Sequence, residues 1–127
     1  MRRTWTIIGV GDVARSQDWY QHLLGLPKSP PAHDYFGQII DDDGTVLLCL
    51  HSWGEHDHPS LTEPTSANGN GLLLFFRVDS FTEALDRARE LSPMLDEEPN
   101  RNPATGTLEF ALRDPDGYCV MVSALDA

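Results

Sequence analysis

Apolar and polar residues alternate along this chain in two patterns, one typical of strands and one typical of helices. Short β-branched or aromatic runs at 4–10, 34–40 and 45–50 predict three strands. Between the first two, Asp12 opens a stretch whose apolar residues recur at helical spacing, and Gly25 and Pro27 close it. Residues 4–50 are therefore expected to form a strand, a helix and two further strands.

The same order of elements returns from residue 71. The run GLLLFFRV predicts a strand, Ser80 with Glu83 predicts a capping box that begins a helix, and 108–113 and 118–123 predict two more strands. An Asp-Gly turn joins the last two strands of each copy, at 42–44 and at 114–117. The chain is thus expected to be one domain over 1–127, with a first module at 4–50, a linker at 51–70 and a second module at 71–125. A stretch rich in prolines and acidic residues at 92–106 predicts a flexible rim loop.

Period two within each strand divides its residues between two faces, of which one is expected to pack under the helices. The residues assigned to the second face are mostly apolar, with a few polar groups: Trp5, Ile7, Gln38, Leu48, Leu50, Leu73, Phe75, Arg77, Glu109, Arg113, Cys119 and Met121. A solvent-exposed face of an antiparallel sheet should be polar, so this apolar face is expected to be covered by a ligand, by a partner subunit or by the sheet curling on itself. Apolar surfaces with a few polar groups are typical of small-molecule pockets. The alternative is a two-sided core or a dimer interface in which Arg77 and Glu109 pair.

Charge and composition narrow the classes of partner. Lys and Arg number 9 against 20 Asp and Glu, a net charge of -11, which argues against nucleic-acid binding and favours cationic ligands. Cys49 and Cys119 lie in apolar runs, which indicates reduced thiols in a cytoplasmic protein. No run approaches the roughly 20 apolar residues of a membrane span, so no membrane association is expected.

The paired modules, the segment DVARSQDWYQHLLGL and the segment EFALRDPDGYCVMVS together resemble the vicinal oxygen chelate superfamily, which includes glyoxalase I, extradiol dioxygenases and bleomycin resistance proteins. The resemblance implies an α+β fold of two βαβββ modules, with eight strands in a cupped mixed sheet, helices outside and a cleft inside. It also implies a homodimer. The residues expected to line the cleft are Trp5, Ile7, Phe36, Gln38, Leu48, Leu50, Trp53, Leu73, Phe75, Arg77, Glu109, Cys119 and Met121.

In metal-dependent members of that superfamily, a His on each module's first strand and a carboxylate on its last strand hold the metal. Counting from Asp12 and Asp79 places Trp5 and Leu73 at the two His positions. Counting from Gly44 and Gly117 places Leu48 and Met121 at the two carboxylate positions. None offers a hard-metal donor, so we expect no metal ligands, no cofactor and no catalytic residue of that type.

The sequence therefore favours a metal-free protein that binds a hydrophobic or cationic small molecule, such as an antibiotic, and resembles the bleomycin resistance branch. The alternative is a lyase, isomerase or dioxygenase that uses a non-standard metal site or metal-free acid–base chemistry with Glu109 and Arg77. A metal site in the loop that carries His51, His56 and His58 belongs to this alternative.

Two further groups carry side chains that can take part in catalysis or metal binding. Cys119 faces the expected cleft, but without a His in register an inert thiol is favoured over a nucleophile. The triplet at 41–43 has three carboxylates, but Asp is common in turns because its side chain hydrogen-bonds to the nearby backbone. Calcium binding is therefore disfavoured.

Overall fold

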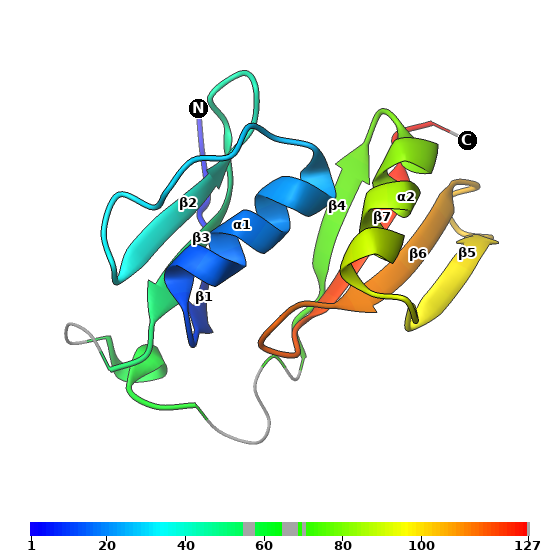
Figure 1. Cartoon of the computed structure of the whole chain (residues 1–127). Helices are drawn as coiled ribbons and strands as arrows, with labels where there is room; N and C mark the ends of the chain where they lie inside the picture. The colour runs from blue at the N-terminus through cyan, green and yellow to red at the C-terminus, as the bar shows by residue number, and fades with distance from the viewer. Residues whose placement is uncertain (55–57, 65–68, 70, 127) are drawn as a thin grey trace. The chain divides into compact units, whose positions relative to one another are not determined.

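The computed structural model describes residues 1–54, 58–64, 69 and 71–126. The chain folds as two compact units, Met1–His22 with Leu26–Ser66, and Leu23–Gly25 with Ala67–Ala127. The elements are shown in Figure 1 and run in this order: β1 (Ile7–Val10), α1 (Val13–Leu24), β2 (Phe36–Ile40), β3 (Val46–Ser52), the 3-10 helix η1 (Pro59–Leu61), β4 (Leu74–Val78), α2 (Phe81–Leu91), β5 (Glu97–Arg101), β6 (Leu108–Arg113) and β7 (Cys119–Ala124).

The first unit is built on a three-stranded sheet in the order β1-β3-β2, in which β1 runs parallel and β2 antiparallel to β3. Asp12 caps α1, because its Oδ1 accepts a hydrogen bond from the Arg15 backbone N–H at 3.0 Å. A Cβ built on Gly37 would meet the side chains of Gln17 and Val13, so the Gly37 side of the sheet packs against α1.

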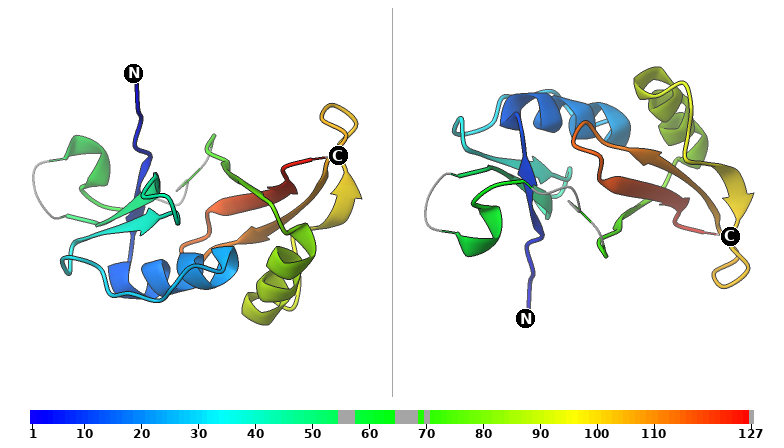
Figure 2. Two further views of the ribbon diagram at one scale, coloured as in Figure 1. Left: turned by 90° about the horizontal axis from the view of Figure 1, so that it is seen from above. Right: turned by 90° about the horizontal axis from the view of Figure 1, so that it is seen from below.

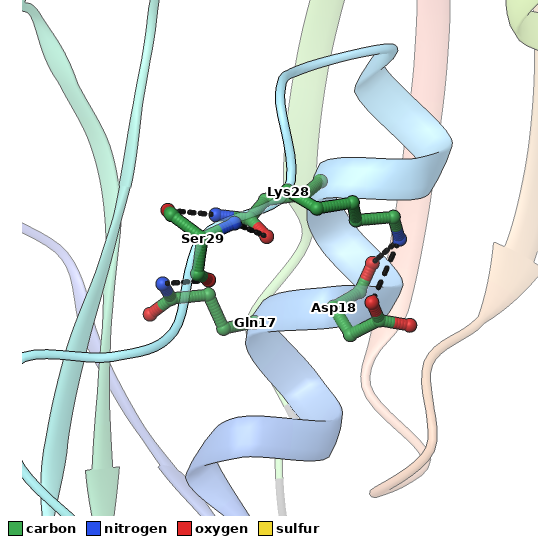
Figure 3. Close-up of polar contacts among 5 residues, drawn as sticks. Gln17, Asp18, Lys28 and Ser29 are labelled. Carbon is green, nitrogen blue, oxygen red and sulfur yellow. Dashed lines mark hydrogen bonds and ion pairs between the residues drawn. The ribbon is translucent and has the colours of Figure 1, made fainter.

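The segment that follows α1 is tied back to the helix by polar side chains (Figure 3). Gln17 Nε2 donates to the Ser29 carbonyl at 2.9 Å, and Gln21 Nε2 donates to Ser29 Oγ at 2.9 Å. Lys28 forms an ion pair with Asp18 at 2.9 Å. Gln17 and Gln21 are buried, so these contacts fix the path of the chain from α1 toward β2.

The second unit is a four-stranded sheet in the order β4-β7-β6-β5, with α2 lying along one face (Figure 2). β4 and β7 are parallel, and the other neighbours are antiparallel. The Phe81 ring of α2 meets the Phe110 ring of β6 edge to face at 5.4 Å, so the Phe110 side of the sheet faces the helix. Ser80 is the N-cap residue of α2, although its side chain makes no capping hydrogen bond with the described residues.

The α+β class expected from the sequence is confirmed, but two details differ. The described residues contain seven strands instead of eight, because the first unit has three strands and only an isolated bridge between His33 and Phe36. The segment 92–106, expected to be a loop, contains β5, an edge strand whose charges and Pro99 are typical of protected sheet edges. Over the described ranges, no helix has the length and apolar character that crossing a membrane requires.

Candidate functional site

Each sheet has one face toward its helix and one face away from it, which we call the distal face. In the second unit, Phe110 marks the helix face, so alternation along β6 puts Glu109 and Ala111 on the distal face. Strand pairing aligns Ala111 with Met121, and Met121 with Phe75. Neighbours in register share a face, so these residues form one continuous row across β6, β7 and β4.

The apolar floor of this distal face consists of Phe75, Met121 and Ala111, with Leu73 one step further along. Phe75 and Leu73 are 43% and 48% exposed, whereas Met121 is buried. Phe75, on the distal face, and Leu73, which directly precedes β4, thus leave apolar surface that an apolar ligand would remove from water.

A polar row lies next to this floor. Arg77, Ser123 and Glu109 are neighbours in register across β4, β7 and β6. Glu109 is 6% exposed, and its carboxylate accepts hydrogen bonds from Asn102 Nδ2 at 3.3 and 3.2 Å. Asn102 Oδ1 in turn accepts from the Ala104 N–H at 2.8 Å, which orients the amide so that Nδ2 points toward Glu109.

The two arginines of this face are held by other partners. Arg77 Nε donates to Ser123 Oγ at 3.3 Å, and its Nη2 donates to the Leu125 carbonyl at 2.7 Å, so Arg77 and Glu109 do not form the ion pair considered from the sequence. Arg113 Nε donates to Asp96 Oδ2 at 2.6 Å, and this hydrogen bond raises the pKa of the guanidinium. Both arginines therefore border the floor as fixed cations.

The distal face of the first unit carries a different set of residues. Pairing across β1, β3 and β2 aligns Ile7, Cys49 and Gln38, and aligns Gly9, His51 and Phe36 in the next row. A Cβ on Gly9 would lie 2.5 Å from the Trp53 ring, so the indole rests directly on this glycine. Ile7, Phe36, Gln38 and Trp53 thus share the distal face, on which alternation in the sequence had placed Ile7 and Gln38.

The prediction that Leu48 and Leu50 lie on this face is wrong. Leu50 pairs with Gly37, and Leu48 pairs with Ile39, so both leucines point toward α1 and are 0–1% exposed. The register between β2 and β3 shifts between Ile39 and Ile40, which leaves Leu47 as an extra residue. A β-bulge of this kind moves every later side chain to the opposite face, and counting from the Asp-Gly turn overlooks it.

Cys49, not Leu48, therefore corresponds to Met121. Cys49 lies between Ile7 and Gln38, as Met121 lies between Phe75 and Ala111. Burial raises the pKa of the Cys49 thiol, with a smaller opposite effect from the Gln38 amide, whose Nε2 lies 3.6 Å from Sγ. The protonated thiol is consequently the form expected at neutral pH.

Histidine and aromatic rings gather at one end of the same face. His51 is buried, and its Nδ1 lies 2.7 Å from the Ser52 carbonyl. The His51 ring lies 5.0 Å from that of His58 and 6.2 Å from that of Phe36. His56 of the proposed metal loop lies outside the described residues, as do its neighbours at 55 and 57. Within the described ranges, no three His, Cys, Asp or Glu side chains are grouped as a metal site would require.

Sequence reasoning missed several distal-face residues, namely Cys49, His51, Asn102, Ala111 and Ser123. Alternation alone could have found Ala111 and Ser123, which lie two residues beyond Glu109 in β6 and Met121 in β7. Cys49 and His51 required the position of the bulge, and Asn102 required the path of the loop after β5. Trp5 precedes β1 and is 56% exposed, so the strand expected from residue 4 begins only at Ile7.

The fold agrees with comparisons to known proteins. The family model of the Glyoxalase/Bleomycin resistance protein/Dioxygenase superfamily matches residues 2–122, and the chain belongs to this superfamily. A lactoylglutathione lyase of Salmonella typhimurium is 25% identical over 136 residues, covering 100% of this chain and 96% of the lyase.

Two solved structures show the same fold. A protein of unknown function from Agrobacterium tumefaciens superposes with a TM-score of 0.72 at 25% identity, covering 98% of this chain and 94% of the other. A glyoxalase/bleomycin resistance protein from Catenulispora acidiphila gives a TM-score of 0.65 at 18% identity, covering 98% of this chain and 99% of the other.

The residues at the superfamily's metal positions do not fit a metal of the kind that His and carboxylate hold. The resemblance implies Trp5, Leu73 and Met121 at three of these positions, and the pairing of β3 places Cys49, instead of Leu48, in the row that corresponds to that of Met121. An indole and an isobutyl group offer no lone pair, and a thioether is too soft for Mn²⁺ or Fe²⁺. A thiol must lose its proton to bind metal, and the raised pKa of Cys49 opposes this. The chemistry of the donor set therefore disagrees with that of the metal-dependent members.

Proposed function

We propose that this chain is a metal-independent ligand-binding member of its superfamily, and that it sequesters a bulky hydrophobic or cationic small molecule such as an antibiotic. The observation that carries the proposal is the apolar surface of Phe75 and Leu73, both nearly half exposed, beside Met121. The resemblance implies that Leu73 and Met121 stand where metal-dependent members have His and carboxylate. Such a floor supplies binding free energy by burial of apolar area.

The ligand-lining set predicted from the sequence enters the proposal without its two core leucines. On the second unit it contains Leu73, Phe75, Arg77, Glu109, Cys119 and Met121. On the first unit it contains Trp5, Ile7, Phe36, Gln38 and Trp53. We further propose a homodimer, which light scattering at several protein concentrations would detect as twice the chain mass.

The test uses protein purified without a tag and treated with a chelator. We expect a neutral naphthyl alcohol to bind with the same dissociation constant before and after chelation, as measured by calorimetry. A thermal-shift panel of cationic antibiotics on the same sample then identifies the preferred class. Stoichiometric Mn, Fe, Ni or Zn in the untreated protein, or turnover of an α-ketoaldehyde adduct, would overturn the proposal.

A second candidate is a lyase or isomerase that uses Glu109 for proton transfer. The buried Glu109 carboxylate and the lyase named among the relatives favour it. A panel of α-ketoaldehyde adducts and vicinal diols would then show turnover by the wild type that Glu109→Gln abolishes while the melting temperature is kept. Absence of turnover across the panel would leave the binding function in place.

A further inference from the structure

The polar row of the second unit contains a buried carboxylate that has no cationic partner among the described residues. Glu109 is 6% exposed, and its described hydrogen-bond donor is the neutral amide of Asn102, at 3.2 and 3.3 Å. Burying a carboxylate is costly unless a charge or several donors compensate it, and a single long amide contact compensates it weakly. The carboxylate is thus arranged to gain free energy from an added cation.

We propose that Glu109 binds the protonated amine of the ligand, which makes the ligand an apolar primary or secondary amine. This inference rests on the proposed binding function and narrows its substrate class. The ammonium would donate to the Glu109 carboxylate, while the apolar body of the ligand lies on Phe75 and Met121.

The spacing of the sheet sets the size of such a molecule. The row of Glu109 and the row of Ala111 and Met121 are two residues apart along the strands. At about 3.4 Å per residue along a strand and about 4.8 Å between strands, Glu109 therefore lies roughly 8 Å from Met121 at the centre of the floor. A two-carbon linker between an amine and a one- or two-ring aromatic body spans this distance, and the exposed Phe75 offers the ring a stacking partner.

Arg77 in the same row does not cancel this preference. Its guanidinium donates to the Leu125 carbonyl at 2.7 Å and to the Ala124 carbonyl at 3.3 Å. One strand, β7, separates Arg77 from Glu109, so two inter-strand spacings of about 4.8 Å put them about 10 Å apart, and the repulsion of the amine by Arg77 is weaker than the attraction of a carboxylate in contact. The net charge of -11 adds a general attraction for cations.

Two matched probes test the proposal, namely 2-(1-naphthyl)ethylamine and 2-(1-naphthyl)ethanol, which share an aromatic body and differ in charge. Calorimetry on the full chain should give roughly tenfold to hundredfold tighter binding of the amine, as for a charge-assisted hydrogen bond. Glu109→Gln keeps the side-chain shape and should remove this preference while changing the affinity for the alcohol less than threefold. Phe75→Ala should weaken both probes equally.

The matched control is Glu83→Gln, which removes the same charge from α2 on the other side of the sheet and should leave the preference intact. If the wild type binds both probes equally, or if Glu109→Gln keeps the preference, the amine assignment is overturned while the binding function stands. If Glu83→Gln lowers amine affinity as much as Glu109→Gln, general electrostatics explain the preference and the assignment is likewise overturned. If neither probe binds, both proposals are overturned.

Discussion

Phe75 and Phe76 are adjacent residues of β4 that point to opposite faces of the sheet, and they provide a direct test of the distal face as a ligand surface. Phe75 is 43% exposed, whereas Phe76 is 9% exposed and lies on the helix face. We predict that Phe75→Ala lowers ligand affinity with a small loss of stability. Phe76→Ala should lower stability by much more and change ligand affinity little.

The exposed fraction of Phe75 sets the size of the effect on binding. A phenylalanine residue presents about 200 Å² when fully exposed, so a ligand that covers the free part removes roughly 90 Å² from water. At about 25 cal/mol per Å², this burial is worth ~2 kcal/mol, so the dissociation constant of the naphthyl alcohol should rise between about tenfold and thirtyfold. Phe76→Ala should lower the free energy of unfolding by about 3–5 kcal/mol, as for other buried Phe residues.

Calorimetric titration and urea denaturation of both variants provide the two measurements. Where Phe76→Ala leaves too little folded protein, Phe76→Leu serves as the control, since such a swap usually costs under about 1.5 kcal/mol. The reasoning fails if Phe75→Ala loses more than about 3 kcal/mol of stability while the affinity is unchanged. Phe75 would then be a core or subunit-interface residue, and light scattering would show which of the two it is.

Other predictions concern the parts of the fold that hold the two distal faces. Cys49 is fully buried and its pKa is raised, whereas Cys119 is partly exposed, so we expect iodoacetamide at pH 7.5 to alkylate Cys119 and to reach Cys49 only after unfolding. Mass spectrometry measures both modifications, and modification of Cys49 in the native protein would contradict the register. Gly37→Ala should destabilise the chain by about 1–3 kcal/mol in urea, because the new Cβ would lie 2.3 Å from Gln17 Oε1. The double variant Gly37→Ala with Gln17→Ala should lose less stability than the sum of the two single variants. If the two losses simply add, the contact with Gln17 is not the cause of the destabilisation. Asp114→Ala should lower the free energy of unfolding by about 2–3 kcal/mol in the same assay, because Asp114 Oδ1 accepts hydrogen bonds from the backbone N–H groups of Asp116 and Tyr118 at 2.9 and 2.8 Å. An unchanged urea midpoint would show that the turn does not need these two hydrogen bonds.

The second unit shows where alternation in a sequence is informative. Arg77, Glu109 and Arg113 are charged residues within otherwise apolar strands, and each marks the face that cannot pack under the helix. Alternation places Phe75 on the same face as Arg77, and the pairing of β7 with β4 and β6 places Met121 there. A slip of one residue in β4 or β6 would turn these charged side chains toward the helix, which disfavours the alternative register.

β3 shows where the same reasoning fails. The run VLLCL is apolar on both faces, so a shift of one residue has no visible effect on its pattern. The extra residue at Leu47 supplies such a shift, and it depends on pairing with β2, which local sequence does not encode. β5 was missed for a related reason, since Glu97, Glu98 and Pro99 are unfavourable in a central strand yet suit an edge.

The corrected register changes one of the candidate metal positions without supplying a metal ligand in its ionised form. Counting from the turn placed a leucine opposite the methionine, and the pairing of β3 places Cys49 there. A thiol is the one side chain among the candidates that can bind a borderline metal, but Cys49 is fully buried and its pKa is raised, so ionisation would place an uncompensated thiolate in the core. The central position of the first unit thus acts as a small apolar group, as Met121 does in the second. The distal face of the second unit keeps a single strongly polar, buried group of acid character, Glu109, and this residue lies one row away from the position that a metal ligand would occupy. We therefore predict that charge recognition on this face depends on Glu109, so that Glu109→Gln removes the difference in affinity between the amine and the alcohol.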